Sequence, residues 1–197
     1  MTDFVLLISD WYRLNARELP WRSTKNPYFI WLSEAILQQT RVDQGLNYYL
    51  KFIENYPVLN NLADADEASV LKLWQGLGYY SRARNLHKTA QQVRDEYQGE
   101  FPKTYQQIIR LKGIGPYTAA AISSFAFDLP HAVVDGNVYR ILSRYYGIDD
   151  AIDSGPGKKI FQELADSLIP ESAPALFNQA IMEFGAIQCV PNNPNCS

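Results

Sequence analysis

The clearest structural signal in the chain is a pair of glycines followed by a proline, in the segment Leu111-Lys112-Gly113-Ile114-Gly115-Pro116-Tyr117-Thr118-Ala119. Glycines on both sides of Ile114 allow a tight turn, and Pro116 suits the first position of the following helix, where its missing N–H is not needed. Such a turn presents free backbone N–H groups at a helix N-terminus, where a phosphate oxygen can bind without side-chain charge. The residues alone leave two interpretations open: a phosphate-binding hairpin, or an ordinary helix–helix turn with a glycine C-cap.

The rest of the chain also has the pattern of helices. Apolar residues recur at helical spacing and alternation with a period of two is nearly absent, which predicts an all-α fold. Prolines and glycines lie between the periodic segments and mark the turns. We expect helices over 2–16, 29–43, 45–55, 67–74, 81–97, 104–111, 116–126, 137–146, 157–168 and 173–187.

The composition is that of a folded protein. With 197 residues and 47 % hydrophobic content, the chain can bury a core as one domain or as two closely packed lobes. It has no apolar run of about eighteen residues. Residues 1–10 lack the basic region and the cleavage site of a secretory signal. We therefore expect a cytoplasmic protein.

The net charge of −3 excludes a protein that holds nucleic acid by bulk electrostatics alone. The charge is unevenly distributed: residues 72–112 carry +5, from eight basic and three acidic side chains, and the remainder carries −8. A basic segment of this kind is typical either of a DNA-binding surface or of an ordinary solvated face. Binding of phosphate through backbone N–H groups would suit such an acidic protein.

Glu34 is the first candidate catalytic residue. It lies in the segment 31–41, whose apolar positions predict a buried helix with Glu34, Gln38 and Arg41 on one polar stripe. A carboxylate beside an apolar stripe tends to have a raised pKa, which would let it donate a proton near neutral pH. The alternative is a surface glutamate close to Arg41.

Asp135 is the second candidate. It directly precedes a predicted helix and suits the N-cap position, a structural role that by itself accounts for the residue. A helix N-terminus also favours the ionised form of a carboxylate. Glu34 as the acid and Asp135 as the anion would be the division of labour that cleavage of a glycosidic bond requires.

Together these segments resemble the helix-hairpin-helix (HhH-GPD) superfamily of base-excision DNA glycosylases, in which the hairpin is followed some twenty residues later by a catalytic aspartate, here Asp135. Within the superfamily the chain is most similar to the A/G-specific adenine DNA glycosylases of the MutY type. Six blocks, in order, carry the resemblance: Leu19-Pro20-Trp21-Arg22, Trp31-Leu32-Ser33-Glu34, Leu37-Gln38-Gln39-Thr40, Trp74-Gln75-Gly76-Leu77-Gly78-Tyr79-Tyr80, Arg82-Ala83-Arg84-Asn85-Leu86 and Val134-Asp135-Gly136-Asn137-Val138.

The resemblance implies an all-α glycosylase fold of two helical lobes, with the active site in the cleft between them. One lobe would be a six-helix barrel over 21–129, containing the hairpin at about 108–126; the other would join 1–20 to 130–197. The implied activity is hydrolysis of the N-glycosidic bond of adenine mispaired with 8-oxoguanine or guanine in double-stranded DNA. We expect the protein to act as a monomer.

The resemblance also assigns roles to single residues. Glu34 would protonate the leaving adenine, Asp135 would stabilise the cationic sugar, Asn137 would orient Asp135, and Tyr117 would line the catalytic pocket. The positions around the flipped adenine are Arg17, Leu19, Trp21, Arg22, Gln179 and Met182. Those expected to enter the duplex, to contact the opposite base or to bind the backbone are Gln38, Gln39, Thr40, Leu77, Tyr79, Lys112, Gly113 and Gly115.

Relatives that also nick DNA carry a Schiff-base lysine where Tyr117 stands, and no lysine lies between Lys112 and Lys158. The chain is therefore expected to leave an abasic site without cutting the strand. Two alternatives stay open. One is a thymine glycosylase for T/G mismatches, which also has a tyrosine at this position, and the other is a non-catalytic helix-hairpin-helix module that only binds DNA.

Cys189 and Cys196, with six residues between them, match the first half of the motif by which relatives bind a [4Fe–4S] cluster. Four thiolates complete such a cluster. We expect a cluster in a longer parent protein and an absent or incomplete one in this chain, with unrelated thiols or a disulfide as the alternative. The resemblance further implies a C-terminal domain that recognises oxidised guanine in these relatives, and we expect this chain to lack it.

Overall fold

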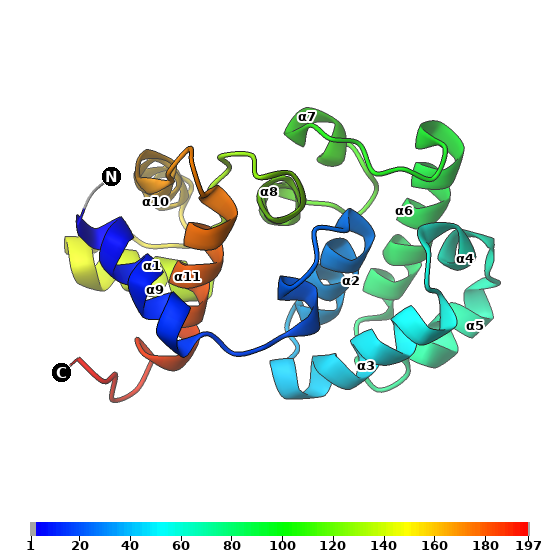
Figure 1. Ribbon diagram of the computed structural model, residues 1–197, viewed down its shortest axis with the longest axis horizontal. Coiled ribbons are helices and arrows are strands. Elements are labelled where there is room, and N and C mark those ends of the chain that lie inside the picture. Colours follow the sequence, from blue (N-terminus) through cyan, green and yellow to red (C-terminus); the bar gives the residue numbers. More distant parts are fainter. Residues whose placement is uncertain (1–2, 197) are drawn as a thin grey trace. The chain divides into compact units, whose positions relative to one another are not determined.

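The computed structural model describes residues 3–196, in which every regular element is a helix and no strand occurs. The all-α prediction is therefore confirmed. In chain order (Figure 1) the helices are α1 (Asp3–Asn15), η1 (Pro20–Arg22, a 3₁₀ turn), α2 (Pro27–Leu37), α3 (Val42–Asn55), α4 (Leu59–Asp64), α5 (Glu67–Trp74), α6 (Tyr80–Tyr97), α7 (Tyr105–Ile108), α8 (Pro116–Phe127), α9 (Gly136–Tyr146), α10 (Gly155–Leu168) and α11 (Pro174–Ile187). Within this range no helix combines the length and the apolar character needed to cross a membrane.

The chain divides into two compact units, and the first is contiguous. It runs from Pro20 to Ile122 and contains η1, α2 to α7 and the start of α8. Helix α6 packs against α2, α4 and α5, while α3 packs against α2 and α5. The core between these helices is fully buried and includes Leu32, Phe52 and Trp74. Burial of each such side chain stabilises the fold by about 1.5–3 kcal/mol.

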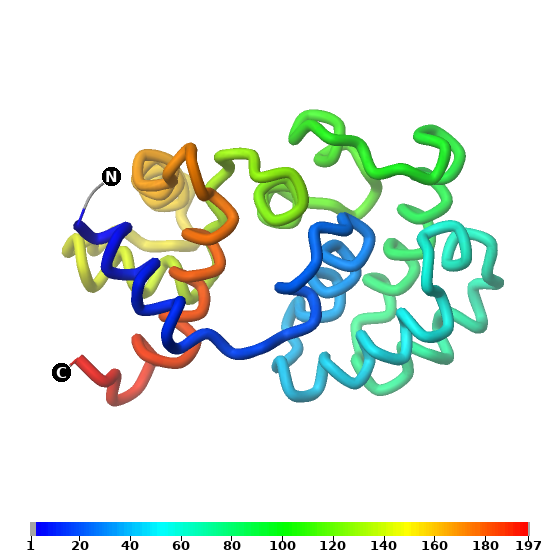
Figure 2. The backbone as a smooth tube through the Cα atoms, viewed as in Figure 1, coloured from blue at the N-terminus to red at the C-terminus, as the bar shows by residue number. Residues whose placement is uncertain are grey.

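The second unit is discontinuous, because it joins the residues up to Leu19 with those from Ser123 onward. Helix α1 packs along α11, so segments far apart in the sequence share one unit, as the blue and orange parts of the tube in Figure 2 show. Helix α9 packs on the same α11. Its hydrophobic core includes Phe4, Leu142, Phe161 and Phe177.

The predicted helix over 29–43 is wrong in its second half. Helix α2 ends at Leu37, and Gln39 has a left-handed φ of 57°, which breaks the helix before α3 begins at Val42. Arg41 is the N-cap position of α3 and so does not continue the polar stripe of Glu34. The sequence also gave no sign of α4, whose six residues are too few for helical periodicity to show.

Candidate active site and DNA interface

Glu34 lies inside the contiguous unit, on the third turn of α2. The helix begins at Pro27, and the Asn26 side chain caps it by accepting a hydrogen bond from the N–H of Tyr28 at 2.9 Å. The Glu34 carboxylate belongs to a helix whose other buried residues are mostly apolar, and only 8 % of the residue is exposed. The surface-glutamate alternative is therefore wrong, because Glu34 is buried and Arg41 lies beyond the end of its helix.

The break after α2 forms the first loop of the candidate DNA interface, which we call the glutamine loop (residues 38–41). Gln38 and Gln39 are exposed, and Thr40 is half-buried. The Gln38 amide donates to the hydroxyl of Thr118 at 3.4 Å, which connects this loop to the first turn of α8. The loop thus presents two amide side chains to solvent next to the hairpin helix.

A second loop, the glycine loop (residues 75–79), follows α5. Gly76 and Gly78 have left-handed φ values of 103° and 70°, and the Trp74 indole donates to the carbonyl of Gly78 at 2.9 Å. Tyr79 is left-handed as well, with a φ of 43°, and is 66 % exposed. Leu77, which we expected to enter the duplex beside Tyr79, is 8 % exposed in this structure. Of the two, only Tyr79 presents a large apolar side chain to solvent.

The hairpin between α7 and α8 is fixed by α6. Lys112 donates its N–H to the Gln92 side chain at 2.9 Å, and its carbonyl accepts a hydrogen bond from the Thr89 hydroxyl. Gly113 has a φ of 75°, and α8 begins at Pro116 as the sequence predicts. Backbone N–H groups in the first turn of a helix have no partner within that helix, so this turn can offer them to an anion.

The two hairpin glycines should respond differently to alanine. Gly113→Ala should destabilise the fold by about 1–2 kcal/mol, because its left-handed backbone disfavours a Cβ. That Cβ would also lie 2.6 Å from the Cβ of Asn85. Gly115→Ala should unfold like the parent, since its Cβ would meet no atom within 4 Å, but should weaken DNA binding where the backbone must approach a phosphate. Urea unfolding and fluorescence anisotropy with a labelled duplex measure the two effects. Equal stability losses in both variants would contradict this assignment.

Asp135 lies in the discontinuous unit and is the N-cap of α9, as the sequence predicts. One carboxylate oxygen accepts the N–H groups of Asn137 at 2.9 Å and Val138 at 2.8 Å, and the other accepts the Asn137 amide at 2.8 Å. Burial nevertheless raises the pKa of Asp135, against the lowering effect of these hydrogen bonds and of Arg140. The net shift is opposite in direction to the one that we expected from the helix N-terminus alone.

Arg140 extends this network and was missed by the sequence analysis. Its guanidinium donates to the Asn137 side-chain oxygen at 2.9 Å, to the carbonyl of Gly185 at 2.6 Å and to that of Cys189 at 2.7 Å. Asn137 is therefore held between Asp135 and Arg140, which fixes the orientation of its amide. The signal in the sequence was the spacing of three residues between Asn137 and Arg140, which places both on one face of a helix.

Four of the expected adenine-pocket residues lie in the same unit as Asp135, and three of them belong to α11 or contact it. Arg17 forms a paired ion contact with Glu183, in which Nε and Nη2 each lie 2.7 Å from a carboxylate oxygen and Glu183 is almost completely buried. Gln179 accepts a hydrogen bond from the Tyr12 hydroxyl at 3.0 Å, and Met182 packs against the hydrophobic core. The structure thus gives Arg17 and Gln179 fixed orientations.

The remaining pocket candidates lie where the two units join along the chain. Leu19 is the last residue of its unit and is buried. Trp21 and Arg22 belong to η1 of the other unit, and the Trp21 ring packs edge-on against Tyr49 with 5.1 Å between ring centres. Tyr117 is half-buried in the first turn of α8.

Cys189 and Cys196 are both free thiols, so they form no disulfide. Cys189 is half-buried and its sulfur accepts a hydrogen bond from Arg144 at 3.2 Å, whereas Cys196 is exposed. Among residues 3–196 no group of three or more His, Cys, Asp or Glu side chains is arranged to hold a metal. Two thiolates are half the complement of a [4Fe–4S] cluster. The described residues therefore do not by themselves fit one.

An all-helical protein with a glycine hairpin that can bind phosphate, a buried glutamate and a hydrogen-bonded N-cap aspartate has the features of a helix-hairpin-helix glycosylase. Residues 32–171 match the family described as HhH-GPD superfamily base excision DNA repair protein. The chain therefore belongs to the HhH-GPD superfamily.

Curated relatives with high similarity are named adenine DNA glycosylase. One from Buchnera aphidicola subsp. Baizongia pistaciae is 44 % identical over 98 % of this chain and 55 % of its own length. One from Mus musculus is 41 % identical over 100 % of this chain and 40 % of its own length. The chain thus spans about half the length of these relatives.

Solved structures of the same fold include a thermostable thymine-DNA glycosylase, with a TM-score of 0.89, 32 % identity and coverage of 98 % of this chain and 89 % of that one. A trapped endonuclease III–DNA covalent intermediate has a TM-score of 0.81 over 98 % of this chain and 87 % of that one. At 21 % identity, this similarity is evidence for a shared fold alone.

Proposed function

We propose that this chain is the catalytic part of a monofunctional adenine DNA glycosylase. Its substrate would be adenine mispaired with 8-oxoguanine or guanine in double-stranded DNA, bound by a single copy of the protein. The observation that carries the proposal is the buried carboxylate of Glu34 on a helix that leads directly into the exposed glutamine loop. The name shared by relatives 40–44 % identical to this chain supports adenine as the base.

In the proposed reaction the hairpin around Gly113 and Gly115 binds the backbone of the DNA, and the adenine rotates out of the duplex. Glu34 donates a proton to a ring nitrogen of the adenine. The glycosidic bond then breaks with its electron pair going to the base, which leaves a cationic sugar. The Asp135 anion stabilises this cation. A water then adds to the sugar carbon and gives its proton to the Glu34 carboxylate, which restores the acid. The products are free adenine and an abasic site.

The side chains that remain have two proposed tasks. Arg17, Leu19, Trp21, Arg22, Gln179 and Met182 would surround the flipped adenine, together with Tyr117. Gln38, Gln39, Thr40, Leu77 and Tyr79 would contact the opposite base and fill the gap that the extruded nucleotide leaves. Lys112 would support the contact of the hairpin with phosphate.

The proposed enzyme leaves the DNA strand intact. Cleavage by a glycosylase of this kind requires an amine that forms a Schiff base with the sugar. The sequence places Tyr117 in the first turn of the hairpin helix and has no lysine between Lys112 and Lys158. Cys189 and Cys196 are proposed as two ligands of a [4Fe–4S] cluster that needs two further thiolates, and no step above depends on it.

Single-turnover base release tests the proposal and its nearest rival. We expect release of adenine from a duplex with adenine opposite 8-oxoguanine, and no strand break until the abasic site is treated with alkali. A thymine glycosylase is the second candidate, because the thymine-DNA glycosylase structure is 32 % identical to this chain. Release of thymine opposite guanine, without release of adenine, would establish that candidate instead. Binding to the duplex without release of either base would indicate a module that only binds DNA.

A further inference from the structure

Arg82, on the first turn of α6, contacts both loops of the proposed DNA interface. One terminal nitrogen of its guanidinium donates to the carbonyls of Ala35 and Ile36, each at 3.2 Å, and to that of Gln38. The other donates to the carbonyl of Leu77 at 3.2 Å. A single side chain therefore caps the C-terminal end of α2, where the glutamine loop starts, and also holds the glycine loop.

The guanidinium also lies over two aromatic rings. Its central carbon lies 5.2 Å from the ring centre of Trp74 and 5.7 Å from that of Tyr79, within the range of cation–π attraction. Burial lowers the pKa of Arg82. Its Nε is buried and has no hydrogen-bond partner among the described residues. Such a desolvated and planar contact is specific for arginine. The compact ammonium group of a lysine cannot reproduce the fixed, planar set of N–H donors of a guanidinium.

Both loops contain a strained residue next to a contact of Arg82. Gln39 and Tyr79 have left-handed φ values of 57° and 43° although neither is glycine. Such backbone conformations persist only where the surrounding structure enforces them, and they cluster at functional sites. Arg82 bonds the carbonyl that immediately precedes Gln39 and stacks on the ring of Tyr79.

The same helix also fixes the hairpin. Thr89 and Gln92 lie on α6 and hold both backbone groups of Lys112, and Asn85 packs against Gly113. A cavity of about 50 Å³ lies among these elements, lined by residues that include Arg82, Asn85, Thr89 and Gly113. Helix α6 thus sets the spacing between the two loops and the hairpin.

We propose that Arg82 is a positioning residue for recognition of the base opposite the adenine, because it holds the glutamine loop and the glycine loop in one fixed relation. The inference rests on the proposed adenine glycosylase function. Arg82 itself touches neither the adenine nor the sugar in this proposal. Loss of Arg82 should therefore reduce the preference for 8-oxoguanine over guanine opposite adenine more than it reduces the rate of adenine release.

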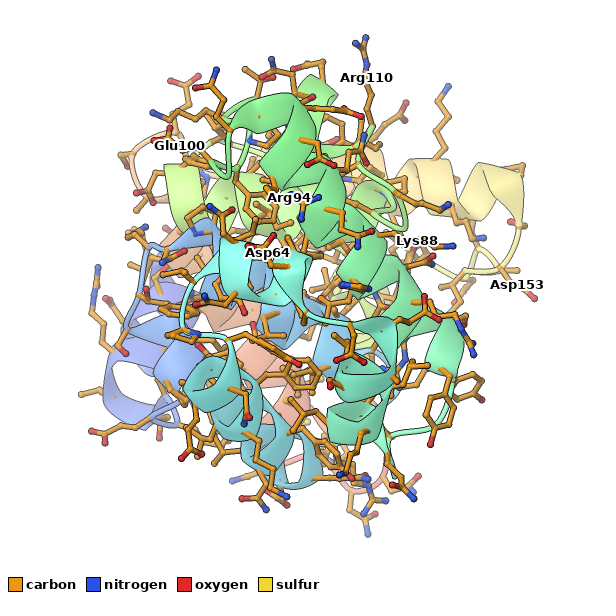
Figure 3. The ribbon with its side chains drawn as sticks, turned by 90° about the vertical axis from the view of Figure 1, so that its right-hand side faces the viewer. Asp64, Lys88, Arg94, Glu100, Arg110 and Asp153 are labelled. Atoms are coloured by element: carbon orange, nitrogen blue, oxygen red, sulfur yellow. The ribbon has the colours of Figure 1, made fainter. Side chains whose placement is uncertain are left out.

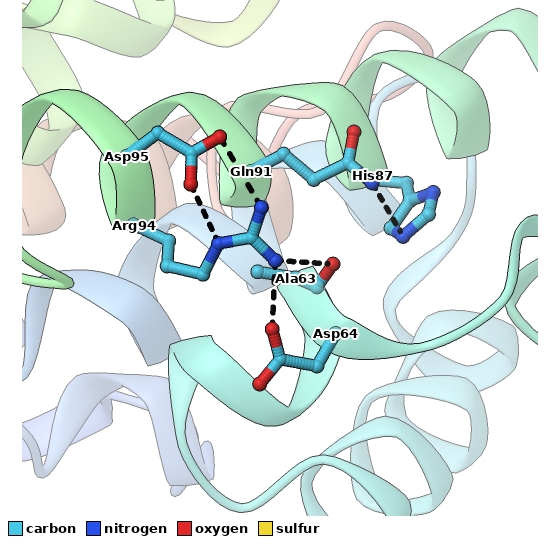
Figure 4. Close-up of polar contacts among 6 residues, drawn as sticks. All are labelled: Ala63, Asp64, His87, Gln91, Arg94 and Asp95. Carbon is cyan, nitrogen blue, oxygen red and sulfur yellow. Dashed lines mark hydrogen bonds and ion pairs between the residues drawn. The ribbon is translucent and has the colours of Figure 1, made fainter.

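Arg94 supplies a matched control on the same helix (Figures 3 and 4). Its guanidinium donates to the carbonyl of Ala63 at 3.3 Å and pairs with Asp64 and Asp95, each at 2.7 Å. Like the Arg82 variants, Arg94→Gln removes from α6 an arginine that binds a backbone carbonyl of another helix. It leaves both loops of the interface untouched.

The test compares the full chain with Arg82→Lys, Arg82→Gln and Arg94→Gln in single turnover, on duplexes with adenine opposite 8-oxoguanine and opposite guanine. The amplitude reports the active fraction, and the ratio of the two rate constants reports recognition. We expect both Arg82 variants to lower this ratio about tenfold, a change of about 1.4 kcal/mol, and Arg94→Gln to preserve it. Amide exchange in residues 36–41 and 75–79 should become faster in the Arg82 variants only.

Other results would overturn the inference. An unchanged ratio in Arg82→Lys, with a loss of amplitude alone, would assign Arg82 a purely structural role. Exchange that stays slow in both loops would do the same, even if the Arg82 variants fold poorly and release little adenine. A parent that releases adenine at equal rates from both duplexes would refute the inference but keep the proposed function. A parent that releases no adenine would refute both.

Discussion

Replacement of Glu34 by glutamine should slow single-turnover release of adenine by about 10²–10⁴-fold, the usual contribution of a general acid. The amide has nearly the same size as the carboxyl group and can occupy its site in α2, but it has no acidic proton to give to the base. The buried position of Glu34, 8 % exposed, means that bulk water does not readily replace this donor. Release from the variant should be measured on adenine opposite 8-oxoguanine, with DNA binding measured in parallel.

Glu54→Gln provides the control for this change. Glu54 is exposed on α3, so the substitution removes the same charge from the surface of the same unit. It should leave the rate constant as it is in the parent. If Glu34→Gln released adenine at the rate of the parent, another group would have to donate the proton and the assignment would be wrong.

Asp135→Asn should reduce adenine release by about 10²–10³-fold, the range found when one group that stabilises transition-state charge is removed. The anion that supports the cationic sugar is lost, whereas asparagine remains a good N-cap for α9. The variant should therefore bind DNA and stay folded. Asp66→Asn is the control, since Asp66 caps α5 by accepting the N–H of Ser69 at 2.9 Å and has no proposed catalytic task.

The raised pKa of Asp135 gives this prediction a second measurement. Because only the anion is active, the rate in the parent should fall with acid at a pH above the ordinary range of an aspartate. The stability of the fold should change with pH in the opposite direction to the rate. A carboxyl group whose pKa is raised by folding favours the folded state when protonated, and this contribution is lost as pH rises through the raised pKa. The free energy of unfolding of Asp135→Asn, minus that of the parent, should thus be larger at neutral pH than at acid pH. A pH-independent difference in free energy of unfolding would contradict this.

The sequence predicted the features that depend on neighbouring residues. The start of α8 at Pro116, the left-handed turn at Gly113 and the cap at Asp135 all follow from local backbone chemistry. The end of α2 could not be predicted in this way. Its terminal carbonyls are bound by Arg82, which lies 44 residues beyond Gln38 along the chain, and a window of local sequence contains no trace of that contact.

Local sequence also does not indicate where the chain divides into its two units, or in which direction the pKa of Asp135 is shifted. The lobe boundary that we expected near residue 129 stays a prediction. The compact units divide between Ile122 and Ser123, inside the continuous helix α8. No glycine, proline or charged residue marks that point in the sequence. The pKa of Asp135 depends on how much of the fold covers it, and the capping pattern by itself indicates only the opposing effect of the helix.

The packing of α1 along α11 has a consequence for synthesis of the protein. The contiguous unit from Pro20 to Ile122 can complete its core while the rest of the chain is still on the ribosome. In the other unit, α1 cannot complete its packing until α11 has emerged, because the two helices form one core. Glu34 would then reach its final surroundings before Asp135 does. In the proposed enzyme, a nascent chain would therefore release no adenine until α11 is made.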